Sequence, residues 1–296
     1  MKWLDMLRRP GPLDVYFREL EGDELLRAER VFFGAIQLSN GTYKTTDSHR
    51  LGDLNELVAD RLPRGRRLQV MDVAVFSGIA TAEWSEQLHL KGINHDLVAG
   101  DLTVSAVLLT LGRHVAVLWQ EGGHPLAVQV GGLCLYLDRP PLITSVPKFA
   151  LARIYRLLVA HVELAPYEAW PAPWRVRLRT VGLVSRQLAS SSAVRIVRDD
   201  IGGTDRFEGQ ADVCRAANIL NRAYFADDVI ETMARNLLDR LAPGGLLAVC
   251  RTCDNGGHHV NRATLVRKME GSLEVVARLN GGSEVEDLVL AAGGAL

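Results

Sequence analysis

Residues 68–81 read LQVMDVAVFSGIAT, and this stretch decides the fold class of the chain. Its first half, Leu68–Val75, is an almost continuous apolar run with one acid, Asp72, inside it. Such a run is typical of a strand that is buried on both faces of a parallel sheet, because a half-exposed strand would alternate. The turn signal Ser77-Gly78 comes next, and the sequence TAEWSEQLHLKG predicts a helix that ends at Gly92. The stretch therefore predicts a strand, a tight turn and a helix, as at the start of a nucleotide-binding α/β fold.

A second acid stands where such folds bind a ribose. The next strand is predicted at Asp96–Gly100 and ends at Asp101, which lies 23 residues beyond Gly78. Nucleotide-binding α/β units place an acid about 20 residues after the glycine turn, where it accepts hydrogen bonds from the ribose hydroxyls. This acid suits NAD as well as other nucleotide cofactors. Its structural alternative is the N-cap of a following helix.

The second half of the chain predicts the remaining parts of a parallel sheet. A strand at 193–197 is followed by two neighbouring acids, Asp199 and Asp200. Further along, the pattern predicts a strand at 212–217, a helix from Asp227 to Leu241, a Pro-Gly-Gly turn, and a strand at 246–250. The last antiparallel strands are expected within 266–279, and residues 254–261 are expected to form a loop at the carboxyl edge of the sheet.

Two of these segments resemble a known family. Asp72–Gly78 resembles motif I of the class I S-adenosylmethionine (SAM)-dependent methyltransferases, written D/E-x-G-x-G-x-G. It keeps the acid and the last glycine, but has Ala74 and Phe76 at the first two glycine positions. The segment 211–252, with its Leu-x-Pro-Gly-Gly turn, resembles motifs IV to VI of the same enzymes. Within it, CRAANILNRAYF is similar to the C-R-N-V-L-I-Y-F stretch of chemotaxis-receptor glutamate methyltransferases.

The resemblance implies a Rossmann-like, doubly wound seven-stranded α/β sheet that binds SAM. It implies that Asp101 binds the ribose, that Asp200 meets the adenine, with Asp199 as the alternative, and that Asn218 lies beside the methionine end. The implied cofactor-binding residues are Asp72, Ala74, Phe76, Ser77, Gly78, Asp101, Leu102, Asp200, Ile201 and Asn218. The candidate catalytic residues, which are polar groups expected near the pocket mouth, are Tyr43, His49, Asn221 and Tyr224.

Two parts of the chain fall outside this resemblance. Residues 1–66 predict an N-terminal helical cap, with residues 67–296 forming the SAM-binding domain. Residues 105–190 interrupt that domain as an inserted β-plus-helix segment. In the insertion, 114–137 predicts two or three short antiparallel strands, because it alternates and is broken twice by Gly-Gly. Phe149–Leu164 predicts an apolar helix, and the arginines of Arg175–Ser190 are interpreted as a solvated helix face.

Composition excludes several other classes of function. The net charge of −1 gives no basic face for nucleic acid, and no apolar run reaches the ~18–20 residues that a membrane span needs. The start of the chain lacks the apolar region of a signal peptide, and four cysteines in 296 residues indicate a reducing, cytoplasmic setting. The pair Cys250-x-x-Cys253 has no second cysteine pair, so we predict no metal site. No P-loop and no G-x-S-x-G elbow is present.

The sequence thus predicts a SAM-dependent methyltransferase whose small-molecule acceptor lies between the Rossmann-like domain and the cap. Three alternatives stay open: a protein carboxyl methyltransferase, an NAD-dependent oxidoreductase, and a non-catalytic scaffold in which Phe76 blocks the cofactor. The likeness at 214–225 favours the first, and the Leu-x-Pro-Gly-Gly turn counts against the second. A homodimer is compatible with the sequence.

Overall fold

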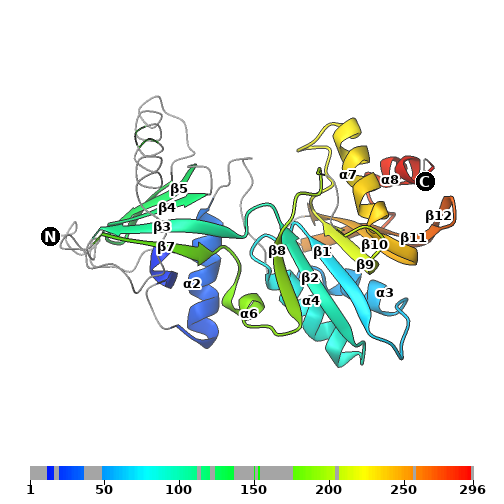
Figure 1. Ribbon diagram of the computed structural model, residues 1–296, viewed down its shortest axis with the longest axis horizontal. Coiled ribbons are helices and arrows are strands. Elements are labelled where there is room, and N and C mark those ends of the chain that lie inside the picture. Colours follow the sequence, from blue (N-terminus) through cyan, green and yellow to red (C-terminus); the bar gives the residue numbers. More distant parts are fainter. Residues whose placement is uncertain are drawn as a thin grey trace. The chain divides into compact units, whose positions relative to one another are not determined.

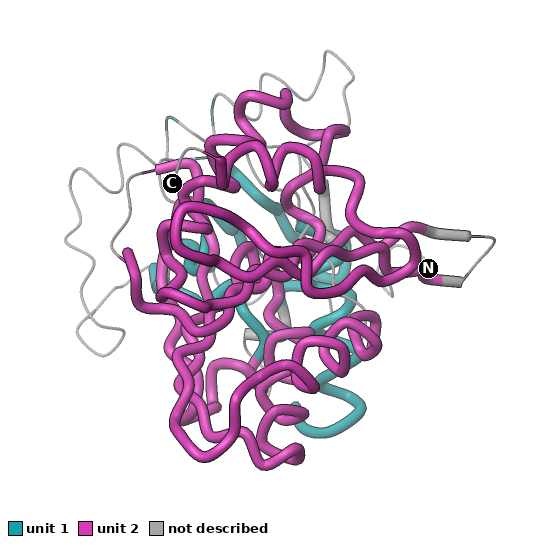
Figure 2. Tube along the Cα trace, turned by 90° about the vertical axis from the view of Figure 1, so that its right-hand side faces the viewer, with its two compact units in different colours: residues 1–46, 103–185 teal, residues 47–102, 186–296 magenta. Residues whose placement is uncertain are grey.

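The structure is a computed structural model of the 296-residue chain. It describes residues 12–16, 20–36, 49–111, 115–120, 124–136, 150, 153, 176–203, 207–255 and 258–294. The chain divides into two compact units, each built from two segments (Figure 2). Unit 1 comprises Met1–Thr46 and Thr103–Ser185, and unit 2 comprises Asp47–Leu102 and Arg186–Leu296. The division differs from the predicted one, because residues 47–66 belong with the parallel sheet rather than with a separate cap.

Unit 1 contains an antiparallel sheet that the sequence predicted only in part. Its strand order is β6-β5-β4-β3-β7. The bounds are β3 Ser105–Leu111, β4 Val115–Gln120, β5 Pro125–Val130, β6 Leu133–Tyr136 and β7 Val176–Gly182. The short 3-10 helix η1 (Pro12–Tyr16) and the helix α2 (Gly22–Ala35) belong to the same unit. Alternate residues of β3 enter two separate apolar clusters, as the two-residue period of a strand requires. One cluster joins Leu108 to Phe32 and Phe33 of α2.

The helix face expected at Arg175–Ser190 is wrong. Its first part is the strand β7 (Val176–Gly182), which pairs antiparallel with β3, and the only helix in the described part of the segment is the four-residue α6 (Arg186–Ala189). Arg177 and Arg179 flank Leu178, and this alternation is the period of a strand rather than of a helix. The predicted helix Phe149–Leu164 and the candidate Tyr43 lie outside the described residues.

Unit 2 contains the predicted seven-stranded, Rossmann-like sheet. Its strand order is β12-β11-β10-β9-β1-β2-β8 (Figure 1). The bounds are β1 Leu68–Val73, β2 His95–Asp101, β8 Val194–Arg198, β9 Ala211–Ala217, β10 Leu241–Asn255, β11 His258–Met269 and β12 Ser272–Leu279. The five strands from β8 to β10 run parallel, and β11 and β12 close the sheet as an antiparallel meander. The carboxyl ends of β8, β2, β1 and β9 therefore meet at one edge.

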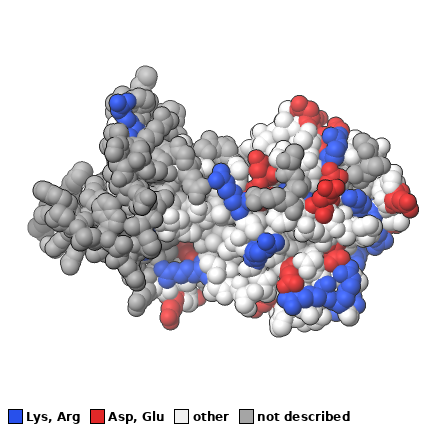
Figure 3. Space-filling model, viewed as in Figure 1, with Lys and Arg blue, Asp and Glu red and all other residues white. Residues whose placement is uncertain are grey.

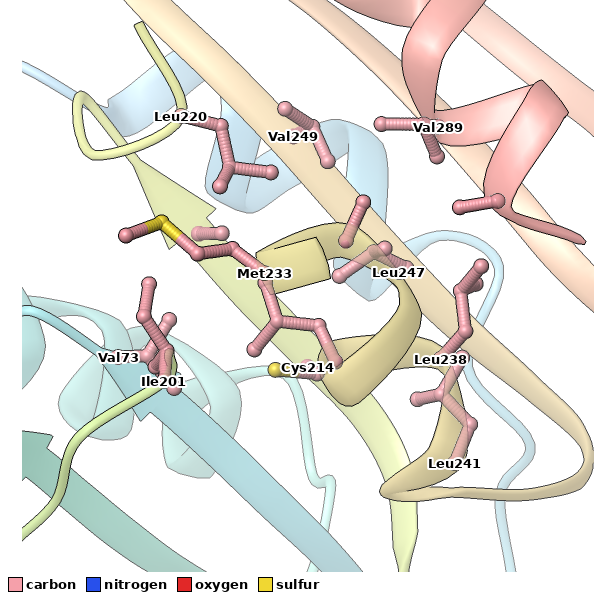
Figure 4. Packing of buried hydrophobic residues seen from close by; sticks show 14 of the residues in the cluster. Val73, Ile201, Cys214, Leu220, Met233, Leu238, Leu241, Leu247, Val249 and Val289 are labelled. Carbon is pink, nitrogen blue, oxygen red and sulfur yellow. The ribbon is translucent and has the colours of Figure 1, made fainter. Parts of the chain in front are cut away.

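Helices cover both faces of this sheet, so the predicted double winding is confirmed. The helices α3 (Gly52–Ala59) and α4 (Ile79–Leu90) lie on one side, and α7 (Asp227–Asp239) and α8 (Glu286–Gly293) on the other (Figure 1). On the second side, Cys214, Leu247 and Val249 of the sheet pack against Met233, Leu238 and Val289 of the helices (Figure 4). Within the described residues, no helix is both long and apolar enough to cross a bilayer.

The end of the sheet differs from the prediction in two places. A loop was expected at residues 254–261, but residues 254–255 and 258–261 pair as the ends of β10 and β11. The strand predicted from Leu246 begins at Leu241, with a register shift between these two residues. Gly244 has φ +81°, and a Cβ on Gly245 would lie 2.8 Å from the Ala211 carbonyl oxygen, so the Gly-Gly turn lets β10 approach β9 closely.

Candidate cofactor site

The turn between β1 and α4 keeps a glycine-type backbone although two of its positions carry side chains. Ala74 and Phe76 both have φ +54°, and Gly78 has φ +76°. These are the three positions that the motif fills with glycine. Non-glycine residues pay about 1–2 kcal/mol for left-handed geometry. A Cβ on Gly78 would lie 2.3 Å from Leu188 Cδ2, so a side chain at this position would have to displace the buried Leu188.

Asp101 connects this turn to the neighbouring strand. It ends β2, it is only 5% exposed, and its Oδ2 accepts a hydrogen bond of 2.8 Å from the Phe76 N–H. The Val75 N–H also donates to the Gly100 carbonyl at 3.2 Å. The next residue, Leu102, is 43% exposed and presents an apolar side chain at the same strand end. The predicted ribose-binding acid thus lies directly against the predicted cofactor turn.

The acid of the motif is bonded to other side chains of the protein. Asp72 is buried and forms a salt bridge with Arg215, which is 1% exposed and is its register partner on β9. Arg215 Nε donates to Asp72 Oδ1 at 2.9 Å and Nη2 donates to Oδ2 at 2.5 Å, while the Thr81 hydroxyl donates to Oδ2 at 2.6 Å. The guanidinium also donates to Asn55 Oδ1 and stacks over Trp84. Asp72 therefore stabilises the turn by linking β1 to β9 through Arg215 and to α4 through Thr81.

The two acids that follow β8 have different surroundings. Asp199 is buried, and its two oxygens accept hydrogen bonds of 2.7 and 3.1 Å from Arg240. Asp200 is exposed, and its Oδ1 accepts a hydrogen bond from the Gly202 N–H at 2.9 Å. The Ile201 side chain belongs to the core beside α7. Of the two acids, Asp200 is therefore the one whose carboxylate faces solvent.

Asn218, at the end of β9, is held in place by the end of β10. It has φ +62°, and its N–H donates to the Cys250 carbonyl at 2.7 Å. Its side-chain oxygen accepts from the Thr252 N–H at 2.7 Å, and its amide nitrogen donates to the Thr252 hydroxyl at 3.2 Å. The Asn218 amide therefore fixes the spacing between two strand ends.

The three described candidates for catalysis differ in burial and in hydrogen-bond partners. Asn221 is buried, and its Oδ1 accepts from Arg251 and from the Ala223 N–H. Tyr224 is 61% exposed, and its ring packs edge-on against Phe225. The His49 side chain is 91% exposed, and the backbone N–H of this residue donates to Glu83. Nearby, burial raises the pKa of the Cys250 thiol to about 12, so this cysteine is a neutral thiol at pH 7.

The residues at this edge fit a nucleoside with a charged or polar tail. Asp101 supplies a carboxylate, Leu102 an apolar surface and Asp200 an exposed acceptor, each at the end of a parallel strand. Ser77 is fully buried in the turn, and its hydroxyl has no hydrogen-bond partner among the described residues, so a polar ligand group could satisfy it. Sequence reasoning missed Arg215, Arg240 and Leu188. An arginine inside the apolar strand at 211–217 was the available signal, because a buried charge requires a partner.

Comparisons with known proteins found similar solved structures but no similar sequence family. No protein-family profile matches the sequence, and no curated protein matches it. The 1,6-didemethyltoxoflavin-N1-methyltransferase of Burkholderia thailandensis, solved with S-adenosylhomocysteine, is 15% identical with a TM-score of 0.36, over 83% of this chain and 68% of that one. An O-methyltransferase family protein from the same organism is 15% identical with a TM-score of 0.32, over 70% and 39%. The [4+2]-cyclase SpnF is 13% identical with a TM-score of 0.31, over 69% and 47%. The chain spans about half the length of several matched structures, 47–55% in three of them.

Proposed function

We propose that unit 2 binds SAM at the carboxyl ends of β1, β2, β8 and β9, and that the protein transfers the methyl group to a small-molecule acceptor. One observation carries the proposal. The turn Ala74–Gly78 has left-handed backbone at the three glycine positions of the methyltransferase motif, and the carboxylate of Asp101 accepts a hydrogen bond from the middle one. Two residues with side chains hold this strained geometry, which is expected where the backbone conformation itself serves binding.

Each strand end has a role in this proposal. Asp101 accepts hydrogen bonds from the ribose hydroxyls, and Leu102 covers one side of the adenine. Asp200 accepts a hydrogen bond from the adenine amino group, and the N-terminus of α4 faces the polar tail. Asn218 supports the site without contacting the ligand. Its side-chain amide is hydrogen-bonded to Thr252 and keeps the ends of β9 and β10 at a fixed spacing.

Bound SAM would supply an already activated methyl group. The protein therefore has to align the acceptor behind that methyl group and to exclude water. Asn221, whose oxygen is held by Arg251, supports the loop after β9 rather than removing a proton. Tyr224, exposed on the same loop, is positioned to contact an acceptor. A small molecule, rather than a protein carboxylate, is the acceptor that we propose.

A second candidate function is binding without transfer. Ala74 and Phe76 carry side chains where the motif has none, and the motif acid Asp72 is already bound to Arg215. Both features favour a SAM-fold protein that serves as a scaffold. This candidate predicts that SAM and S-adenosylhomocysteine do not bind, whereas the proposed function predicts that both do.

Titration calorimetry with SAM and with S-adenosylhomocysteine tests the proposal. We expect dissociation constants in the micromolar range for the native chain. We expect Asp101→Asn to weaken binding of both ligands at least tenfold, about 1.4 kcal/mol, because the carboxylate loses its charge toward two hydroxyl donors.

Asp96→Asn is the matched control, since Asp96 lies at the other end of the same strand and pairs with Arg67. Its affinity for SAM should equal that of the native chain. The ribose assignment fails if Asp101→Asn and Asp96→Asn bind SAM equally well. The cofactor proposal itself fails if the native chain binds neither ligand.

A further inference from the structure

Unit 2 has a cavity at the amino-terminal edge of its sheet, opposite to the edge of the candidate cofactor site. Its volume is about 340 Å³, within the range of small-molecule pockets. Four separate parts of the chain line it: the end of α3 with the residues before β1, the start of β9, the turn that opens β10, and β11. We call it the N-edge cavity. Its charged lining consists of Asp60, Arg61, Arg66, Asp212 and Arg267.

Both acids of the N-edge cavity are already neutralised by partners. Asp212 accepts two hydrogen bonds from Arg66 and one of 2.8 Å from the Gln69 N–H. Burial raises the pKa of Asp212, but these hydrogen bonds outweigh it and lower the pKa overall. Asp60 accepts a hydrogen bond of 2.8 Å from Lys91, which also lowers its pKa. Each of the two carboxylates is therefore paired with a cationic side chain.

Two of the three guanidinium groups that line the cavity, those of Arg61 and Arg267, have N–H groups available to donate further hydrogen bonds. Arg61 donates to the Leu57 carbonyl at 2.9 Å and, in the described part of the chain, forms no salt bridge with a carboxylate. Among the described residues, Arg267 donates one side-chain hydrogen bond, of 3.1 Å to Glu274, and both side chains are about one-third exposed or more. Exposed pairs of this kind contribute roughly 0–1 kcal/mol, so a better acceptor can replace Glu274. Figure 3 shows basic side chains, with acidic ones among them, over the part of unit 2 that holds α3 and the start of β2.

We propose that the N-edge cavity binds an oxyanion, the phosphate group of a small metabolite, through Arg61 and Arg267. Guanidinium groups bind phosphate through paired, charge-assisted hydrogen bonds. Arg61, just after α3, and Arg267 of β11 both line the cavity. Leu62, Pro243 and Leu246 also line the cavity, so a small apolar group attached to the phosphate would meet some apolar surface beside a mainly polar lining.

The test is a calorimetric titration of the full chain with inorganic phosphate and, separately, with phenyl phosphate, at constant ionic strength. We expect both to bind with dissociation constants at or below the low millimolar range. Tighter binding of phenyl phosphate would identify a phosphorylated organic ligand, and equal binding would identify free phosphate; both results support an oxyanion site. Arg61→Gln and Arg267→Gln should each weaken phosphate binding at least fivefold, and Arg61→Lys should weaken it less than Arg61→Gln.

Arg235→Gln is the matched control, because Arg235 is an exposed arginine on α7 that pairs with Glu231. It should bind phosphate as the native chain does. The oxyanion site is refuted if phosphate and phenyl phosphate do not bind, or if Arg61→Gln and Arg267→Gln both bind them unchanged. None of these readouts involves SAM, so the result is independent of the proposed methyltransferase function.

Discussion

Arg215 is a charged side chain that is 1% exposed, in a strand with strands on both sides. Its positive charge is balanced by Asp72, and its guanidinium also donates hydrogen bonds to the Asn55 side-chain oxygen and the Ala80 carbonyl. The guanidinium lies 4.2 Å from the centre of the Trp84 ring. Burying two charges costs several kcal/mol per ion, and good geometry with further hydrogen bonds offsets that cost. The net gain in stability from the pair is therefore small, but the loss on breaking it is large.

Replacement of Arg215 by methionine should test this asymmetry. Arg215→Met leaves the Asp72 carboxylate buried without its partner, so we expect the free energy of unfolding to fall by about 3–5 kcal/mol. The double variant Asp72→Asn with Arg215→Met should recover part of that loss, because no buried charge remains. Urea unfolding followed by circular dichroism measures both values. Arg235→Met, at an exposed pair on α7, should change stability by less than about 1 kcal/mol. Equal losses at Arg215 and Arg235 would contradict the argument.

Residue type and spacing together predicted the position of one acid of the candidate site. Asp101 was predicted from its spacing to Gly78, and it does lie against the turn. The partner of Asp72 was not predicted, because it depends on β9 lying beside β1 with Asp72 in register with Arg215. Which of the neighbouring acids is buried depends in the same way on Arg240, which lies 41 residues beyond Asp199. Such long-range pairs follow from topology rather than from local pattern.

One carboxylate of the helix α8 forms hydrogen bonds to the last two strands, in addition to the apolar contacts of this helix. Glu286, in its first turn, accepts hydrogen bonds from Arg278 Nη2 at 2.7 Å and from the Thr264 hydroxyl at 2.6 Å. The Arg278 hydrogen bonds are the main cause of a lowered pKa at Glu286. The carboxylate thus links α8 to β12 and β11 in its ionised form.

The stability contributed by Glu286 should consequently depend on pH. Because the pKa is lower in the folded state than in the unfolded state, the contribution is fully present above the unfolded pKa of about 4.3. It is lost as the pH falls through the lower folded pKa. We expect Glu286→Gln to be less stable than the native chain at pH 7, and the difference to shrink below about pH 4. Urea midpoints at pH 7, 4 and 3 measure it, and a difference that stays constant with pH would contradict the assignment.

The elements of unit 2 were predictable because their signals are local. The apolar run of β1, the helix after Gly78 and the amphipathic helix α7 each follow from residues within one element. The strand β7 was wrongly predicted as part of a helix, because Arg177 and Arg179 were taken as one face of a helix although they are two residues apart, which is the period of a strand. The hairpin of β10 and β11 was misread because Gly256, Gly257 and the polar residues around them resemble a loop, although their neighbours pair as strands.

At the scale of the whole chain, the sequence of unit 2 is interrupted by residues 103–185, which form unit 1 together with residues 1–46. The interruption begins and ends at adjacent points, since the Leu183 N–H donates to the Val104 carbonyl at 2.8 Å and Ser105 pairs with Gly182. The unit 2 strands that precede and follow residues 103–185 in the sequence, β2 and β8, are neighbours in the seven-stranded sheet. The Asp199 N–H donates to the Asp101 carbonyl at 3.0 Å. A short connection can therefore replace the whole insertion without separating β2 from β8.

A shortened chain tests whether unit 2 is an independent folding and binding unit. It joins residues 47–102 to residues 186–296 through a short Gly-Ser linker, which retains all seven strands and the helices on both faces. We expect it to unfold cooperatively in urea, because the described apolar cluster between its sheet and the helices α7 and α8 contains no residue from unit 1. We expect its SAM affinity to stay within tenfold of the full chain, since every described residue of the candidate cofactor site lies in unit 2. Cooperative unfolding with no SAM binding, where the full chain does bind, would mean that unit 1 completes the site. A chain without cooperative unfolding would mean that the parallel sheet needs unit 1 to fold.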